Sequence, residues 1–136
     1  MKLKFAVALL IAPLMIACGD DDPAGPSADN VAGTYRLQTV NGAALPFVFI
    51  NEPGLRVEVM ADEYVLNANQ SFTTTITLRE TEDTVVTTTT DSYSGQWQVD
   101  GSDIILTSPG IVDRASFSNG NTLTFTFPGV ALVYRK

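Results

Sequence analysis

From residue 31 to the end of the chain, apolar and polar positions alternate with a period of two. In the segment 71–79, Phe72 and Ile76 share one face, while the opposite face consists mainly of threonines. This is the period of a β-strand that buries one face. The alternation recurs in four further segments: 55–59, 96–99, 122–127 and 130–134. The pattern predicts a series of half-buried strands, with room for at most one short helix, near residues 60–64.

Turn motifs separate these segments, mostly at intervals of 9–14 residues. Asn-Gly and Asp-Gly favour type I′ hairpin turns and Pro-Gly favours a type II turn, because Gly readily adopts a positive φ. Short strands at such regular spacing indicate an all-β sandwich or barrel. The predicted turns are Asn41-Gly42, Pro53-Gly54, 67–70, 81–83, Asp91-Ser92, Asp100-Gly101, Pro109-Gly110, Asn119-Gly120 and Pro128-Gly129.

Because tight turns join each strand to the next, the simplest fold is an antiparallel meander. An open sheet would expose two unpaired edges, and closure removes both. We therefore predict an all-β fold, an antiparallel up-and-down barrel of about eight to ten strands. The interior of such a barrel is either filled by side chains or just wide enough for one small ligand. The residues expected in the barrel interior or facing a ligand are Tyr35, Phe72, Ile76, Trp97 and Phe125.

Residues 1–17 are predicted to be a signal peptide rather than part of the fold. Lys2 and Lys4 form a short positive region, and the 13 residues from Phe5 to Ala17 carry no charge. Such a run is too short to cross about 30 Å of hydrocarbon as a helix, but it suits the apolar region of a secretory signal. The alternative is a buried N-terminal helix, which the acidic residues 20–22 disfavour.

The end of this run, Leu14-Met15-Ile16-Ala17-Cys18, resembles the lipobox of bacterial lipoproteins. The resemblance implies cleavage before Cys18 and attachment of acyl chains such as palmitate to Cys18. It also implies export and anchoring in the bacterial cell envelope, with the outer membrane as the expected location. Two or more acyl chains give durable membrane binding, whereas one gives only marginal binding. The alternative is a plain secretory signal that happens to contain a cysteine.

Residues 18–30 are predicted to form a lipidated flexible tether. The segment is rich in Asp, Gly and Pro and nearly free of large apolar side chains, so it cannot bury enough surface to offset its ordering entropy. The three acidic residues 20–22 lack the spacing of a calcium-binding loop.

Composition excludes several kinds of chemistry. The chain has no His and one Cys, which removes Ser-His and Cys-His nucleophiles and His-ligated metals. The net charge of −7 argues against binding nucleic acid, which requires Lys and Arg to neutralise phosphates. Carboxylates remain as the candidates for acid–base work, but we expect most of them at turns or on solvent faces. We therefore predict no enzyme, no cofactor and no metal. These carboxylates are Glu58, Asp62, Glu63, Glu80 and Asp113.

Three groups of residues in the domain predicted for 31–136 resemble the lipocalin-like domains of bacterial lipoproteins. They are Val31–Leu37 with Val40-Asn41-Gly42 and Leu45-Pro46, then Gly95-Gln96-Trp97 with Asp100-Gly101 and Ile104–Leu106, and finally Val130–Arg135. Gly33 is followed by Tyr35 where lipocalins carry Gly-x-Trp. The resemblance implies that Arg135 packs on Tyr35 in a cation–π contact. The chain has a weaker resemblance to META-type lipoprotein domains.

Two functions follow from this resemblance and stay open at this point. In the first, the membrane-anchored barrel binds a small apolar ligand in its mouth. In the second, it is a structural or interaction protein of the envelope, with a fully packed barrel and no ligand cavity. The oligomeric state is not determined by either.

Overall fold

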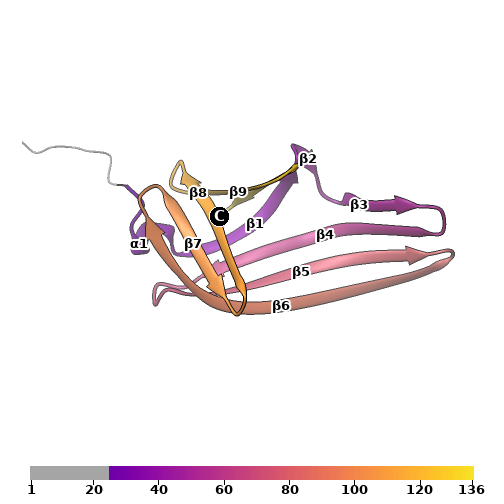
Figure 1. Ribbon diagram of the computed structural model, residues 1–136, viewed down its shortest axis with the longest axis horizontal. Coiled ribbons are helices and arrows are strands. Elements are labelled where there is room, and N and C mark those ends of the chain that lie inside the picture. The colour runs from indigo at the N-terminus through magenta and orange to yellow at the C-terminus, as the bar shows by residue number, and fades with distance from the viewer. Residues whose placement is uncertain (1–24) are drawn as a thin grey trace, which may run out of the picture.

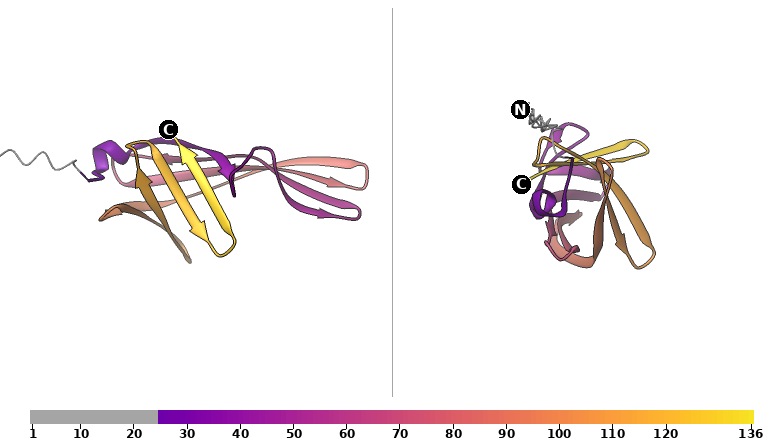
Figure 2. Two further views of the ribbon diagram at one scale, coloured as in Figure 1. Left: turned by 90° about the horizontal axis from the view of Figure 1, so that it is seen from above. Right: turned by 90° about the vertical axis from the view of Figure 1, so that its left-hand side faces the viewer.

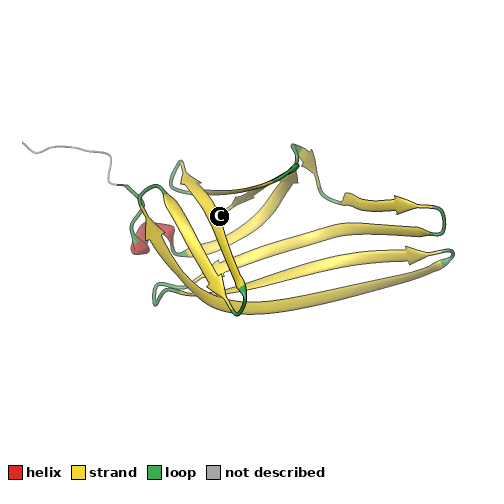
Figure 3. Ribbon diagram, viewed as in Figure 1, coloured by secondary structure: helices red, strands yellow, loops and turns green. Residues whose placement is uncertain are grey.

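Ten β-strands and one short helix make up residues 25–136, the part of the chain that the computed structural model describes (Figures 1 and 3). The all-β fold predicted from the alternation is confirmed. The predicted signal peptide, Cys18 and the tether up to residue 24 lie outside the described residues. The elements are α1 (Ala28–Val31), β1 (Gly33–Val40), β2 (Ala43–Ala44), β3 (Phe47–Glu52), β4 (Leu55–Leu66), β5 (Ser71–Glu82), β6 (Val85–Asp100), β7 (Asp103–Ser108), β8 (Ile111–Ser118), β9 (Thr122–Phe127) and β10 (Val130–Arg135).

Pairing between β1 and β4 closes the sheet. Neighbouring strands are antiparallel, and the order β1-β10-β9-β8-β7-β6-β5-β4 returns to β1 through pairs between residues 33–36 and 63–66. Eight strands therefore form a closed barrel of lipocalin-like architecture. The two remaining strands are additions to it, since β2 pairs with β1 and β3 pairs with β4. This agrees with the predicted barrel of eight to ten strands.

Three barrel strands are much longer than the others and continue past the barrel. β4 and β5 have twelve residues and β6 has sixteen, whereas β7, β9 and β10 have six each. We call the projecting sheet the arm. It consists of β3 with residues 55–59 of β4, 77–82 of β5 and 85–91 of β6, and it extends away from α1 in Figures 1 and 2.

The predicted turn at Asp91-Ser92 is wrong, because both residues lie inside β6. Their partners on β5 are Ile76 and Thr75. Asp and Ser favour turns locally, but twelve consecutive residue pairs hold β6 against β5. Because the arm is a single layer of sheet, residues 85–94 are exposed along their whole length.

Helix α1 covers the end of the barrel opposite the arm (Figure 2). Ser27 and Asn30 form a reciprocal capping box that begins the helix, and Val31 is fully buried. The helix therefore lies partly in residues that we expected in the tether. Residues 60–64, where the pattern left room for a short helix, belong to β4. Within the described residues, no helix is long and apolar enough to span a membrane.

A tightly packed core fills the barrel from α1 to its middle. The largest buried side chains are Trp97, Tyr35, Tyr134 and Phe125. Trp97 Nε1 donates a hydrogen bond of 3.0 Å to the carbonyl oxygen of Asn67, and the Tyr35 hydroxyl donates to the carbonyl of Val31 in α1. Burial raises the pKa of Tyr35 to about 12. The polar tips of the buried aromatics are thus satisfied, as burial requires.

The expected contact between Arg135 and Tyr35 is replaced by one from the next residue. Lys136 Nζ lies 5.5 Å from the centre of the Tyr35 ring and donates to the carbonyl oxygens of Asn30 and Ala32. The reason is the strand period. Tyr134 faces the interior, so Arg135 faces outward, where it is exposed and pairs in register with Arg36. Lys136 returns to the inner side and joins the end of β10 to α1.

Gly95 occupies a position in β6 where no side chain fits. A β-carbon there would lie 2.6 Å from Phe72 Cε1 and would also clash with the carbonyl oxygen of Thr107 on the neighbouring strand. The Phe72 ring is part of the packed core, and the Thr107 oxygen is a backbone atom of β7, so neither can easily move away. The close approach of β5, β6 and β7 at this point therefore depends on a glycine.

We predict that Gly95→Ala lowers the free energy of unfolding by about 1–3 kcal/mol, because an extra methyl group overpacks the wall. Urea denaturation of the purified protein measures this. Gly25→Ala is the matched control, since a β-carbon at Gly25 meets nothing within 4 Å. Equal stability of the two variants would contradict the prediction.

Candidate functional site

An apolar pocket of about 400 Å³ lies where the mouth of the barrel meets the base of the arm. Strands β1 and β10 supply one wall, β3 of the arm supplies another, and β4 and β5 complete it. Most of the side chains that line it are aliphatic or aromatic. They are Leu37, Val40, Asn41, Phe47, Val48, Phe49, Val59, Asp62, Ile76, Val130 and Leu132.

The pocket begins where the packed core ends. Along β10, Leu132 lines the pocket, and Tyr134, the next inward residue, belongs to the core. Along β5 the same step separates Ile76 from Thr74, and Thr74 is buried. The interior is therefore divided into a filled half near α1 and an open half near the arm.

A layer of aromatic rings forms the boundary between the two halves. The Tyr64 ring lies 5.3 Å from that of Phe125 and 5.2 Å from that of Tyr134, measured between ring centroids. Phe125 and Tyr134 are 5.5 Å apart, in an edge-to-face arrangement. Such clusters of rings pack favourably beyond their buried area. The layer gives the pocket a rigid base.

Among the described residues that line the pocket, Asp62 is the only one with an ionisable side chain. Its Oδ2 accepts a 2.7 Å hydrogen bond from the Tyr134 hydroxyl, and its Oδ1 accepts a 3.2 Å hydrogen bond from the Thr74 hydroxyl. Burial raises the pKa of Asp62 above its ordinary value, and these two hydrogen bonds oppose that rise. The groups that hold the carboxylate in place are all neutral.

Tyrosine hydroxyls extend this polar group across the barrel. Tyr64 Oη lies 3.3 Å from Tyr93 Oη on β6. Burial raises the pKa of both Tyr64 and Tyr134, and Asp62 nearby raises them further. Both phenols therefore stay protonated and act as neutral hydrogen-bonding groups beside the carboxylate.

Two further carboxylates share the inner face of the sheet. Asp91 pairs in register with Ile76, which lines the pocket, and Asp113 pairs with the buried Leu106. Residues directly opposite each other in an antiparallel pair lie on the same face. Burial raises the pKa of Asp113. Our expectation that most carboxylates lie at turns or on solvent faces is therefore wrong for Glu58, Asp62 and Asp113.

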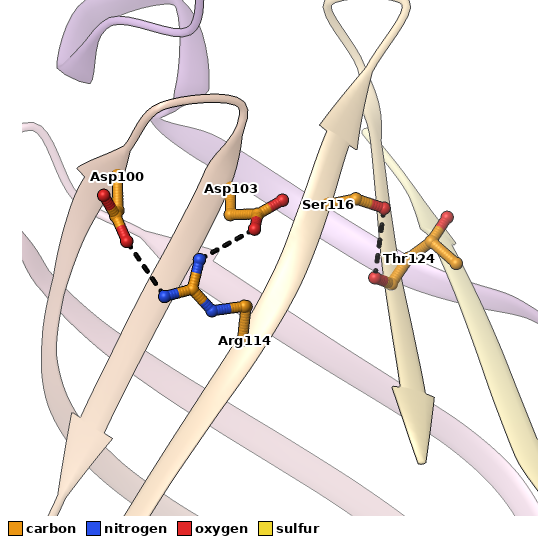
Figure 4. Close-up of polar contacts among 5 residues, drawn as sticks. All are labelled: Asp100, Asp103, Arg114, Ser116 and Thr124. Carbon is orange, nitrogen blue, oxygen red and sulfur yellow. Dashed lines mark hydrogen bonds and ion pairs between the residues drawn. The ribbon is translucent and has the colours of Figure 1, made fainter. Parts of the chain in front are cut away.

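The cations among residues 25–136 lie away from this pocket. Arg36 pairs with Glu63, Arg56 and Arg79 pair with Glu58, Arg135 is exposed, and Lys136 lies at the α1 end. Arg114 lies between Asp100 at 2.9 Å and Asp103 at 2.7 Å on the outer face of the barrel (Figure 4).

A second, shallower hollow surrounds Arg114, together with Ser116 and Thr124 (Figure 4). The two carboxylates raise the pKa of Arg114 and already accept its hydrogen bonds. Ser116 is also engaged, through its contact with the Thr124 carbonyl. The polar groups of this hollow thus satisfy one another, so we place the candidate site at the first pocket.

The residues singled out in the sequence occupy two places. Tyr35, Phe72, Trp97 and Phe125 lie in the buried core, and Ile76 lines the pocket. Cys18 lies outside the described residues. Sequence reasoning missed the pocket role of Asp62, because a β-bulge between Val59 and Ala61 shifts the alternation by one residue. Before the bulge, odd-numbered residues face inward, and after it even-numbered residues do.

Comparisons with known protein families, with curated proteins and with solved structures find no match for this chain. Among residues 25–136, no group of three or more Cys, Asp and Glu side chains is placed to hold a metal ion. The functional argument therefore depends on the geometry of the pocket.

Glu58 forms ion pairs on the face of the arm that points away from the pocket. This side chain is only 5% exposed, and it accepts from Arg56 at 3.0 Å and from Arg79 at 2.7 Å. The two guanidinium groups hold the pKa of Glu58 below its usual range. The pair with Arg79 joins β4 to β5 within the arm, and the pair with Arg56 lies within β4.

We predict that Glu58→Gln makes stability less sensitive to acid. Because folding lowers the pKa of Glu58, its contribution is present above the unfolded pKa of about 4.3 and is lost as the pH falls through the folded value. Urea midpoints at about pH 6 and about pH 3 should therefore differ less in this variant than in the parent.

Glu52→Gln is the matched control, since Glu52 is exposed on β3 and forms no ion pair with any described residue. Its acid sensitivity should equal that of the parent. An unchanged pH dependence in Glu58→Gln would refute the stabilising role of the ion pairs.

Proposed function

We propose that this chain is a lipid-anchored protein of the bacterial cell envelope whose barrel binds a small apolar molecule in its mouth. The observation that supports binding is the pocket of about 400 Å³, lined mostly by apolar side chains with one carboxylate. Small-molecule sites are typically concave, mostly apolar and about 300–1,000 Å³ in volume, with a few polar groups that fix orientation.

Anchoring is supported by the sequence Leu14–Cys18, which resembles a lipobox, and by the charge-free run before it. In this proposal the acyl chains on Cys18 hold the protein at the membrane, and the barrel works beside it. A protein so placed can take apolar molecules from the lipid phase or pass them to it.

We propose that the protein is not an enzyme. Asp62 accepts hydrogen bonds from the hydroxyls of Thr74 and Tyr134, and the chain has no His, the side chain whose ordinary pKa lies closest to neutrality. The same arrangement suits binding, where fixed polar groups are an advantage.

The second candidate function is that of a structural or interaction protein. The filled half of the barrel favours it, since Trp97, Tyr35, Phe125 and Tyr134 leave no space among them for a ligand. The arm also presents exposed side chains, including Phe49 at 67%. A ligand titration separates the two functions.

We predict that the neutral fluorophore naphthalen-2-ylmethanol binds saturably, with one molecule per protein. The measurement is calorimetric titration of the full chain held in phosphatidylcholine nanodiscs, with protein-free nanodiscs as the blank. Ile76→Trp should abolish binding, because the larger ring fills the pocket that Ile76 lines.

Thr73→Trp introduces the same ring on the exposed outer face of the same strand and should bind like the parent. If the parent gives only the heat of the blank, the pocket does not bind such molecules, and the interaction function replaces the binding function.

For the anchor, we predict that Cys18→Ser abolishes incorporation of labelled palmitate in a bacterial host, because the serine hydroxyl does not accept the lipid through the thioether linkage that the lipobox resemblance implies. The protein should then leave the membrane fraction. Palmitate labelling of the variant at the parental level would overturn the anchoring proposal.

A further inference from the structure

The carboxylate of Asp62 lines the pocket, and no cationic side chain among residues 25–136 pairs with it. The five ion pairs among residues 25–136 involve Glu58, Glu63, Asp100 and Asp103, and none involves Asp62. Its partners are two neutral hydroxyls, at 2.7 and 3.2 Å. A desolvated carboxylate without a cation is costly, so an arrangement that keeps one in an apolar pocket calls for a partner.

The surroundings of Asp62 add negative potential. Asp91 lies on the same inner face as Ile76, and Asp113 is close enough to Tyr64 to raise the pKa of that phenol. The titratable groups that face this region are therefore Asp62, Asp91, Asp113 and the tyrosines 64, 93 and 134. Every basic side chain of residues 25–136 lies elsewhere, as shown above. The field in the mouth of the barrel thus favours a positive charge.

The polar groups of the pocket are also arranged to receive a hydrogen-bond donor. Asp62 accepts one hydrogen bond on each oxygen, which leaves further acceptor capacity on both. The rings of Tyr64 and Tyr134 belong to the core layer below the pocket, and neither is part of its lining. In the rest of the lining, Leu37, Val59 and Leu132 offer apolar contact, and the amide of Asn41 is already engaged by the backbone of Gly129 and Ala131.

We propose, as an extension of the binding function proposed above, that the pocket selects an apolar molecule that carries a protonated amine. The ammonium group contacts Asp62, and the apolar body lies against the aliphatic wall and the β3 residues Phe47 and Phe49. An ammonium supplies both the charge and the donors that the carboxylate lacks. Charge-assisted hydrogen bonds of this kind are about twice as strong as neutral ones.

The same argument disfavours fatty acids and other apolar anions that enter with the carboxylate first. Their charge would face Asp62 in a region that contains no described cation, and like charges in low dielectric repel strongly. Neutral apolar molecules bind through the wall alone. Because folding has already desolvated Asp62, the ammonium gains the interaction without a new cost on the protein side.

The test uses three probes with the same naphthalene body: the cationic naphthalen-2-ylmethylamine, the neutral naphthalen-2-ylmethanol and the anionic naphthalene-2-carboxylate. Each is titrated calorimetrically into the full chain in phosphatidylcholine nanodiscs, whose zwitterionic lipid does not itself attract the amine by net charge. We expect the amine to bind about 10- to 100-fold more tightly than the alcohol, the range of a hydrogen bond to a charged group. The carboxylate should bind most weakly.

Asp62→Asn should remove most of the preference for the amine over the alcohol. The amide keeps an oxygen that accepts from Tyr134 and loses the charge. Glu63→Gln is the matched control, since it removes a carboxylate from the neighbouring residue on the outer face of β4, and it should keep the preference. The selectivity of the unmodified protein needs no variant, so the test holds even if Asp62→Asn fails to fold.

The outcomes separate the two proposals. Binding of the alcohol and the amine with equal affinity overturns the amine proposal and leaves the binding function standing. Binding of neither probe overturns both. A preference for the amine that survives Asp62→Asn overturns the assignment to Asp62, whereas a preference that disappears in this variant and persists in Glu63→Gln supports it.

Discussion

The short pairing between β1 and β4 is the contact on which the rest of the structure depends. Four residue pairs, from Gly33–Leu66 to Arg36–Glu63, turn a ten-stranded meander into a closed barrel. An ion pair of 2.9 Å between Arg36 and Glu63 reinforces it on the outer face. Without this closure the buried aromatics would face solvent, and residues 33–36 and 63–66 would present unpaired strand edges. With it, the interior has one end covered by α1 and one end facing the arm.

The unequal length of the strands then creates the pocket. The strands β7, β9 and β10 end after six residues, while β4, β5 and β6 continue into the arm. Side chains from all barrel strands fill the half of the barrel near α1. At the mouth, the arm faces the short strands with too few side chains to fill the space between them. The pocket is therefore a consequence of where strands stop, and its lining combines barrel residues such as Leu132 with Phe47 of the arm.

Asp62 differs from the charged groups that the fold pairs with an opposite charge. Glu58, although nearly inaccessible, has two guanidinium partners, and Arg114 has two carboxylates. Asp62 has only neutral partners, and burial raises its pKa. A protein gains no stability from a buried carboxylate of this kind. Binding sites are where such unfavourable groups are retained, because a ligand can complete what the fold leaves incomplete.

The sequence by itself determined the all-β fold, the position of most turns and the identity of the core. Period-two alternation and Asn-Gly, Asp-Gly and Pro-Gly pairs act locally, so they are readable without a structure. The tertiary structure decided which face of β4 carries Asp62, since the bulge after Val59 exchanges the two faces and leaves no signature in composition. It also decided that Asp91-Ser92 continues a strand, because pairing with β5 outweighs local turn preference. The pocket brings together residues far apart in the chain, such as Val40 and Val59, and no local pattern encodes that arrangement.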